Sequence, residues 1–319
     1  MTALPKPRGP LSDAVLSALR QPPTEPVAPI TTEPESADDA AITLWALQEL
    51  SYRGFDELGD DSVDEWEPEL VRVRRRLEDD LEARLRDRWP GVPAGVDLET
   101  GFFDWVADHD GPSLARHVQT QATEDQVRDL LRVRSVYHLK EADPTTWVIP
   151  RLPNAPKAAL VELQYDEYGV GDPARVHSQL FARGMAASGL RTEYGAYVDE
   201  APVEILEQNA ALSMFGLQRR LRGAAVGHLA AFEATSSLPS RQLAQGLERL
   251  GFPAEMSAYY AEHVEADAVH EQVAVRDICA ALVREEPRLE ADVWFGAWAC
   301  LDLEDRTAHR MLGSWGVAA

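Results

Sequence analysis

The chain has 319 residues, of which 45% are hydrophobic and 27% are charged, so it is long and apolar enough to bury a sizeable core. Its 54 acidic and 31 basic residues give a net charge of −23, which disfavours nucleic acid and anionic membranes as partners. Two cysteines exclude a disulfide framework, and no apolar run reaches the roughly 20 residues needed to cross a bilayer. The N-terminus lacks the features of a signal peptide, so we expect a cytoplasmic globular protein.

Prolines are concentrated at the start of the chain, where eight of the 21 fall within the first 40 residues. Proline removes a backbone donor and blocks helix interiors, and few large apolar residues accompany these prolines. We therefore expect residues 1–37 to form a mobile tail that buries little surface, with one short helix around Leu11–Leu19.

Apolar residues recur at three- and four-residue steps from Asp38 onward, which is typical of amphipathic helices. One long charged helix has an apolar face formed by Leu70, Val73, Leu77, Leu81 and Leu85. The pair Trp89-Pro90 ends this helix, because proline cannot continue it. Residues 38–112 are therefore predicted to form an N-terminal helical extension.

Helix boundaries are also marked in the second part of the chain. The pair Asp172-Pro173 predicts the start of a helix that ends before Gly189. Pro239 predicts the start of another helix, which ends near Gly251.

The segment from Ile205 to Ala234 is rich in small residues and predicts one long helix that closely approaches a neighbouring helix or a ligand. Alternating, strand-like runs are absent from the sequence. The fold class predicted is therefore all-α, a bundle of seven or more helices, with residues 113–319 as its main domain.

Three potential metal ligands share one face of a predicted helix near the C-terminus. His263, Asp267 and His270 are spaced by four and then three residues, so their side chains point the same way. Imidazole and carboxylate together suit iron, manganese or zinc. The alternative is a solvated acidic face, because other glutamates surround these residues.

Further candidates lie in two earlier segments. Glu167 ends one predicted helix and His177 lies in the next, and the glycine-rich turn between them can direct both side chains to one point. Glu162 and Asp166 are rival ligands beside Glu167, with surface charge as their alternative role. Glu141 is a weaker candidate at another helix end.

Together these segments supply three carboxylates and three imidazoles. They are Glu141, Glu167, His177, His263, Asp267 and His270. Three carboxylates cancel most of the charge of two divalent irons, which permits burial of the whole group. Helix bundles hold carboxylate-bridged di-iron sites in their cores, so we predict such a site here.

With these residues identified, the sequence resembles the haem-oxygenase-like di-iron oxidases and oxygenases, in the branch of iron-containing redox enzymes. The resemblance rests on the six residues and on the phrases LKEADP, DEYGVG and HVEADAVHEQ, and it includes SMFGLQRRLRGAAVGHLAAFEATSSLPSR at residues 213–241. It covers about residues 40–315. It implies a haem-oxygenase-like helical bundle that binds two Fe(II) ions per chain, uses O2 as co-substrate and contains no haem.

The resemblance also implies a reaction class. It implies oxidation of a small amine or amino acid in natural-product biosynthesis, with N-oxygenation favoured over oxidative C–C cleavage or desaturation. The expected partners are a small-molecule substrate and an external electron donor, with a homodimer left open. Two alternatives remain, a haem-binding protein on the same fold and a non-catalytic helical partner protein. A haem protein needs one axial histidine and no acidic cluster, so the carboxylates argue against it.

Other side chains are weaker candidates. His228 and Glu233 face either the pocket or the core, and three arginines either clamp a substrate carboxylate or, as we favour, form a solvated face. The aromatic side chains beside the ligand segments, and both cysteines, are expected to pack. Four further histidines have no partner at ligand spacing and are expected at the surface or in the core. These groups comprise Arg219, Arg220 and Arg222; Trp147, Tyr165 and Tyr168; Cys279 and Cys300; and His109, His117, His138 and His309.

Overall fold

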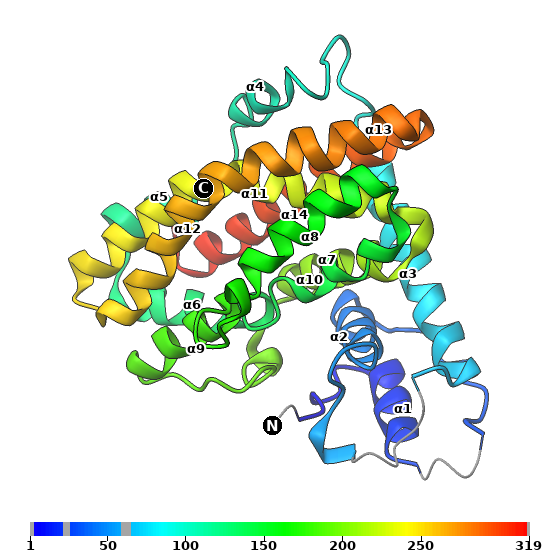
Figure 1. The fold of residues 1–319 in the computed structure, drawn as a ribbon. Coiled ribbons are helices and arrows are strands. Elements are labelled where there is room, and N and C mark those ends of the chain that lie inside the picture. Colours follow the sequence, from blue (N-terminus) through cyan, green and yellow to red (C-terminus); the bar gives the residue numbers. More distant parts are fainter. Residues whose placement is uncertain (1–2, 22–25, 59–64, 318–319) are drawn as a thin grey trace.

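The computed structural model describes residues 3–21, 26–58 and 65–317, apart from the side chains of residues 265–268. This part of the chain is helical and contains no strand (Figure 1). The α-helices are α1 (Pro10–Leu19), α2 (Ala37–Glu49), α3 (Pro68–Arg88), α4 (Phe102–Ala107), α5 (Leu114–Thr120), α6 (Glu124–His138), α7 (Asp143–Thr146), α8 (Asn154–Glu167), α9 (His177–Ala187), α10 (Val203–Leu217), α11 (Arg222–Leu250), α12 (Ala254–Gln272), α13 (Ala281–Glu285) and α14 (Glu290–Ser314). A π-helical stretch, Val273–Ala280, joins α12 to α13. The predicted all-α class is confirmed.

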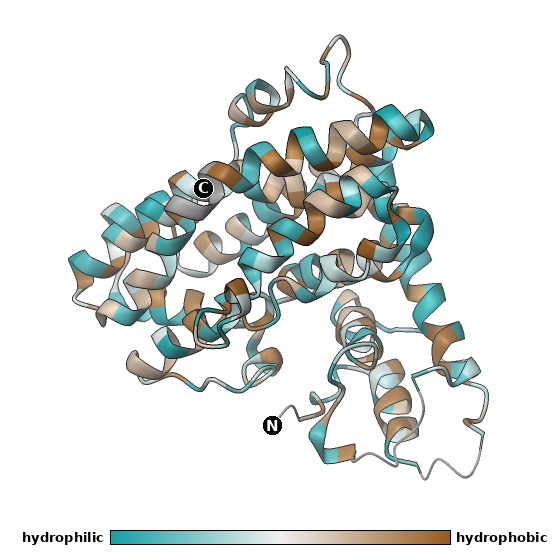
Figure 2. Ribbon diagram, viewed as in Figure 1, coloured by the Kyte–Doolittle hydropathy of each residue, from teal (hydrophilic) through white to brown (hydrophobic). Residues whose placement is uncertain are grey.

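The centre of the bundle is the pair α11 and α14, whose backbones touch at two glycines. A Cβ atom on Gly227 would lie 1.9 Å from the carbonyl oxygen of Val293, and one on Gly296 would lie 1.9 Å from that of Ala224. Only glycine permits this approach. The small residues of the predicted long helix therefore serve helix packing, and α12, α5 and α10 complete the bundle around this pair. Figure 2 shows hydrophobic and hydrophilic patches alternating along these helices, as amphipathic helices require.

The N-terminal segment buries more surface than its prolines suggest. Leu11, Val15 and Leu16 of α1 are completely or almost completely buried, and α1 packs on α2 beside the bundle (Figure 1). The Asp39 carboxylate accepts hydrogen bonds from the backbone N–H groups of Leu11 and Ser12, at 3.1 and 2.8 Å, and so caps α1 from another helix. The expectation of a tail with little burial is wrong, because the large apolar residues of α1 share one buried face and Leu4, Val27 and Ile30 outside α1 are buried as well. The division of the chain into residues 1–37, 38–112 and 113–319 stays a prediction.

Three predicted helix boundaries are wrong. The helix expected over residues 205–234 is broken, because Gln218 has an extended backbone and a short 3-10 turn, Arg219–Leu221, separates α10 from α11. Pro239 lies inside α11 and does not begin a helix, since tertiary packing offsets the lost backbone hydrogen bond. Asp172 accepts a hydrogen bond from the N–H of Ala174 in a turn, and the next helix starts only at His177. The predicted ends before Gly189 and at Gly251 are confirmed, with both glycines left-handed.

Candidate metal centre

Six buried side chains from four helices and one turn form two adjacent clusters of metal-ligand type. The first comprises Glu141, His177 and His263, and the second comprises Glu167, Glu233 and His270. Glu141 lies in the turn between α6 and α7, Glu167 ends α8, His177 begins α9, Glu233 lies in α11, and the other histidines lie in α12. Within each cluster, one ligand atom from every member lies within 4.8 Å of the others.

Glu167 joins the two clusters. One of its carboxylate oxygens lies 3.0 Å from Nδ1 of His177, and the other lies 3.4 Å from Nδ1 of His270. The same nitrogen of His270 lies 3.7 Å from Glu233. A carboxylate with one oxygen toward each cluster has the position required to bridge two metal ions.

The turn between Glu167 and His177 explains how ten residues bring these side chains together. Gly169 and Gly171 have φ angles of 77° and 83°, and Val170 between them has φ 57°, so three successive residues are left-handed. A Cβ on Gly169 would lie 2.5 Å from the backbone nitrogen of Val176, the residue before His177. Glycine is required there because the chain folds back on itself. The predicted redirecting turn is confirmed.

Glu141 is held by two further side chains. The Tyr259 hydroxyl donates a 2.7 Å hydrogen bond to Oε1 of Glu141, and Nδ1 of His138 lies 3.3 Å from the same oxygen. His263 completes the surroundings, with Nε2 at 3.5 Å from Glu141. His138 is buried, within the expected surface-or-core placement, but the expectation that it has no partner at ligand spacing is wrong. The signal that was available is the His-x-x-Glu spacing of 138 and 141, a separation of three residues at which side chains can meet.

The pKa values of the clustered side chains indicate where protons bind when no metal is present. Burial acts to raise the pKa of Glu167, but hydrogen bonds from His177 and His270 lower it to about 2. Burial likewise opposes the charged form of His270, yet its contacts with Glu167 and Glu233 raise its pKa to about 11. Burial and the charge of Glu167 raise the pKa of Glu233. Protons on imidazole therefore balance the carboxylates where metal ions would otherwise do so.

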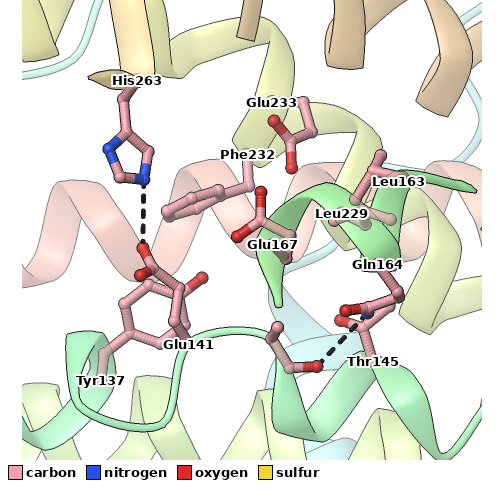
Figure 3. A pocket seen from close by; sticks show the side chains of 11 residues that line it. Tyr137, Glu141, Thr145, Leu163, Gln164, Glu167, Leu229, Phe232, Glu233 and His263 are labelled. Carbon is pink, nitrogen blue, oxygen red and sulfur yellow. Dashed lines mark hydrogen bonds and ion pairs between the residues drawn. The ribbon is translucent and has the colours of Figure 1, made fainter. Parts of the chain in front are cut away.

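The donor set fits a pair of divalent cations. A cavity of about 20 Å³ lies between Glu141, Glu167, Glu233 and His263, and Figure 3 shows these side chains around one space. Oε2 of Glu141 is buried without a hydrogen-bond partner among the described residues, although an unpaired buried carboxylate oxygen is costly. Three carboxylates and three neutral imidazoles offset most of the charge of two M²⁺ ions.

Five of the six residues predicted as ligands are brought together, namely Glu141, Glu167, His177, His263 and His270. Their role as ligands stays a prediction. The side chain of Asp267 lies outside the described part of the structure. Glu233, which the sequence left between pocket and core, belongs to the second cluster. The rival Asp166 lies 3.3 Å from Nε2 of His270 but is half exposed, and Glu162 is exposed.

The remaining candidates lie apart from both clusters. His228 is buried, and burial lowers its pKa to about 4. Arg220 pairs with Glu82, and Arg222 pairs with Glu286, which accounts for these two arginines without a substrate. Trp147, Tyr165 and Tyr168 are partly exposed, so the expectation that they pack in the core is wrong, whereas Cys279 and Cys300 are buried as expected. His117 stacks on Trp315, His109 pairs with Asp305, and Arg219 and His309 are exposed.

Comparison with known proteins identifies the family. The model of the iron-containing redox enzyme family matches residues 128–305, which is more than half of the chain and includes every predicted ligand. The chain belongs to this family. This family member also resembles the crystal structure of a CADD-like protein of unknown function from Nostoc punctiforme PCC 73102, with 15% identity and a TM-score of 0.50. The match covers 74% of this chain and 97% of the other, and at this identity it concerns the fold alone.

No curated protein matches this family member. Its fold is the haem-oxygenase-like helical bundle that the sequence predicted. None of the helices in the described ranges combines the length and apolar character that crossing a membrane requires.

Proposed function

We propose that this protein is a non-haem di-iron oxidase or oxygenase that activates O2 and oxidises a small amine or amino acid. The observation that supports the proposal is the pair of buried clusters joined by Glu167. A single haem would need one axial histidine, whereas this site offers a carboxylate-rich set of the kind that holds two irons.

The candidate ligands in the described part of the chain would divide between two metal ions. Glu141, His177 and His263 would hold one ion, and Glu233 and His270 would hold the other, with Glu167 shared between them. Asp267, one turn after His263 in α12, stays a predicted ligand. When bound, a pair of irons supplies the two-electron chemistry that reduces O2.

The surrounding side chains hold Glu141 in position and form an apolar wall beside the site. Tyr259 and His138 fix the carboxylate of Glu141 by hydrogen bonds, and a fixed ligand would hold a metal in one geometry. Leu163, Leu229 and Phe232 give the same small space an apolar part of its wall (Figure 3). A water-free site protects reactive oxygen species from side reactions.

Within this proposal we favour N-oxygenation over oxidative C–C cleavage or desaturation, in natural-product biosynthesis in the cytoplasm. We also propose a small-molecule substrate, an external electron donor and no nucleic-acid or membrane partner, with a homodimer left open. The acidic surface supports the exclusion of nucleic acid.

The experiment is an anaerobic Fe(II) titration of the full chain followed by Mössbauer spectroscopy. The wild type should saturate at about two irons per chain, the count that such bundle sites hold. Glu141→Ala and His270→Ala remove one ligand from each cluster, and each should reduce saturation to about one. Glu262→Ala is the matched control, because Glu262 lies on α12 but pairs with Arg175 at the surface.

Other outcomes separate the alternatives. A Soret band in the purified protein would support the haem-binding reading. Failure of the wild type to bind any iron would support a non-catalytic helical partner. Equal loss of iron in Glu262→Ala and His270→Ala would contradict the site assignment.

A further inference from the structure

A second, larger cavity lies beside the candidate metal centre. Its volume is about 250 Å³, and it runs between α5, α6, α11 and α14. Exposed residues of the segment before α5, including His109 and Ser113, form its outer rim, whereas the buried Tyr260 and His138 lie at its inner end. This volume suits a ligand of roughly a dozen non-hydrogen atoms at the density of packed matter.

The wall of this cavity carries a carboxylate that is held in place and still accessible. Glu304 accepts hydrogen bonds from Nη1 of Arg134 at 3.0 Å, from Nη2 of the same arginine, and from Nε2 of Gln208 at 2.9 Å. Its side chain is 40% exposed although Leu303 and Thr307 beside it are fully buried, and it lines the cavity. A carboxylate accepts about four hydrogen bonds, so Glu304 has capacity for a donor from a ligand.

Two further acceptors line the same cavity. Asp305 pairs with Nε2 of His109 through one oxygen, at 2.9 Å, near the rim. Pro239 has no N–H and leaves the main-chain carbonyl of Thr235 without its helical donor, and both residues line the cavity. Much of the remaining wall is apolar, including Leu130 and Leu243. Arg134 also lines the cavity, but both of its terminal nitrogens already donate to Glu304. The ligand that fits best therefore donates hydrogen bonds at this end and is apolar along its body.

The larger cavity adjoins the candidate metal centre at one shared residue, Phe232, and at His138. Phe232 lines both spaces. His138 lines the larger cavity and lies 3.3 Å from Glu141 of the first cluster. The inner end of the larger cavity therefore lies beside side chains that contact the first cluster.

We propose that this cavity is the substrate chamber and that it binds a primary amine with an apolar body, whose ammonium group is held by Glu304. Calling the bound amine a substrate rests on the proposed function. The binding of the amine itself does not depend on iron. Glu304 is a specificity-determining residue, because an acceptor-only side chain discriminates against carboxylates and favours cations.

The experiment measures binding of n-hexylamine by isothermal titration calorimetry, with the full chain both metal-free and loaded anaerobically with Fe(II). Both forms should bind n-hexylamine more tightly than n-hexanol or hexanoate. Glu304→Gln should weaken amine binding by at least about tenfold, the size of one charge-assisted hydrogen bond. Asp302→Asn is the matched control, because Asp302 lies on the same helix and pairs with Arg88 outside the cavity.

A second variant protects the test against misfolding, because Glu304→Gln leaves the buried Arg134 less well paired. Ser240→Leu fills the cavity without changing charge and should abolish amine binding while Fe(II) stoichiometry is retained. Unchanged amine binding in Ser240→Leu, or hexanoate binding as tight as hexylamine binding, would overturn the inference. Absence of amine binding in a wild type that still takes up two irons would overturn the inference and leave the proposed function standing. Amine binding without any iron uptake would support the chamber and remove the proposed function.

Discussion

Nζ of Lys140 lies 2.5 Å from Oε1 of Glu49, and these two charged side chains are only 4% and 3% exposed. Glu49 is the last residue of α2, whereas Lys140 directly precedes Glu141 of the first cluster. The Tyr194 hydroxyl donates a 2.9 Å hydrogen bond to Glu49, and the ring of Tyr52 lies 4.2 Å from the ammonium group. The N-terminal extension is therefore tied to the turn that carries a predicted metal ligand.

Breaking this ion pair should strongly destabilise the protein. Glu49→Ala leaves a buried ammonium group without its partner, so we expect urea unfolding to show a loss of about 3–5 kcal/mol. Glu33→Ala, which removes the exposed partner of Arg76, should change stability by less than about 1 kcal/mol. Replacing both members, by Glu49→Leu with Lys140→Met, should restore much of the lost stability. A double variant that is less stable than Glu49→Ala would refute this account.

The N-terminal helix should be needed for stability. Deleting residues 1–21 removes Leu11, Val15, Leu16 and Leu19 from the core, each worth about 1.5–3 kcal/mol of burial. The truncated protein should unfold at markedly lower urea concentration. Leu16→Ala should cost about 2–5 kcal/mol, whereas the exposed Ser17→Ala should cost less than about 0.5 kcal/mol. An unchanged unfolding midpoint after truncation would show that α1 contributes nothing.

Two glycines of α14 should respond oppositely to alanine. Gly296→Ala places a Cβ against the backbone of α11, so we expect a loss of at least about 1–3 kcal/mol. A Cβ on Gly313 meets nothing within 4 Å, and Gly313→Ala should stabilise the protein by about 0.5–1 kcal/mol. Thermal unfolding of both variants measures the contrast, and equal effects would contradict the close contact of α11 and α14.

The metal-free protein should have a defined pH range of greatest stability. The raised pKa of His270, about 11, adds stability that is complete below the unfolded value of about 6.5 and is lost as the pH rises toward 11. The lowered pKa of Glu167, about 2, adds stability that is complete above about 4.3 and is lost as the pH falls toward 2. These two groups therefore favour folding most between about pH 4.5 and 6.5.

Urea unfolding of chelator-treated protein from pH 3 to 10 measures this profile. His270→Ala should flatten the decline on the alkaline side. Because Fe(II) would replace a proton on His270, the affinity of the protein for Fe(II) should rise with pH over the same range. Stability that increases from about pH 7 to 10 in the metal-free wild type would oppose the assigned direction.

Local patterns in the sequence predicted what depends on nearby residues. Helical periodicity predicted α3, and the spacing of His263 and His270 predicted that α12 brings both histidines to the clusters, where their role as ligands stays a prediction. Glu233 joins its cluster only through tertiary packing, because its partner His270 lies 37 positions further along the chain, so no local spacing marks it. The pairing of Glu49 with Lys140 is invisible for the same reason, since 91 positions separate them. The prediction that Pro239 starts a helix was wrong because packing can outweigh the cost of one missing backbone hydrogen bond.

The backbone contact of α11 with α14 fixes the separation of the side chains that these two helices carry. Gly227 and Gly296 lock the two helices against sliding. One helix carries Glu233 at the metal clusters, and the other carries Glu304 at the wall of the larger cavity. The span between these carboxylates is thus set by main-chain packing and is independent of ligand. Under the proposed function, a molecule anchored at Glu304 would present to the metal site whichever atom lies at that span, and selection would act on chain length.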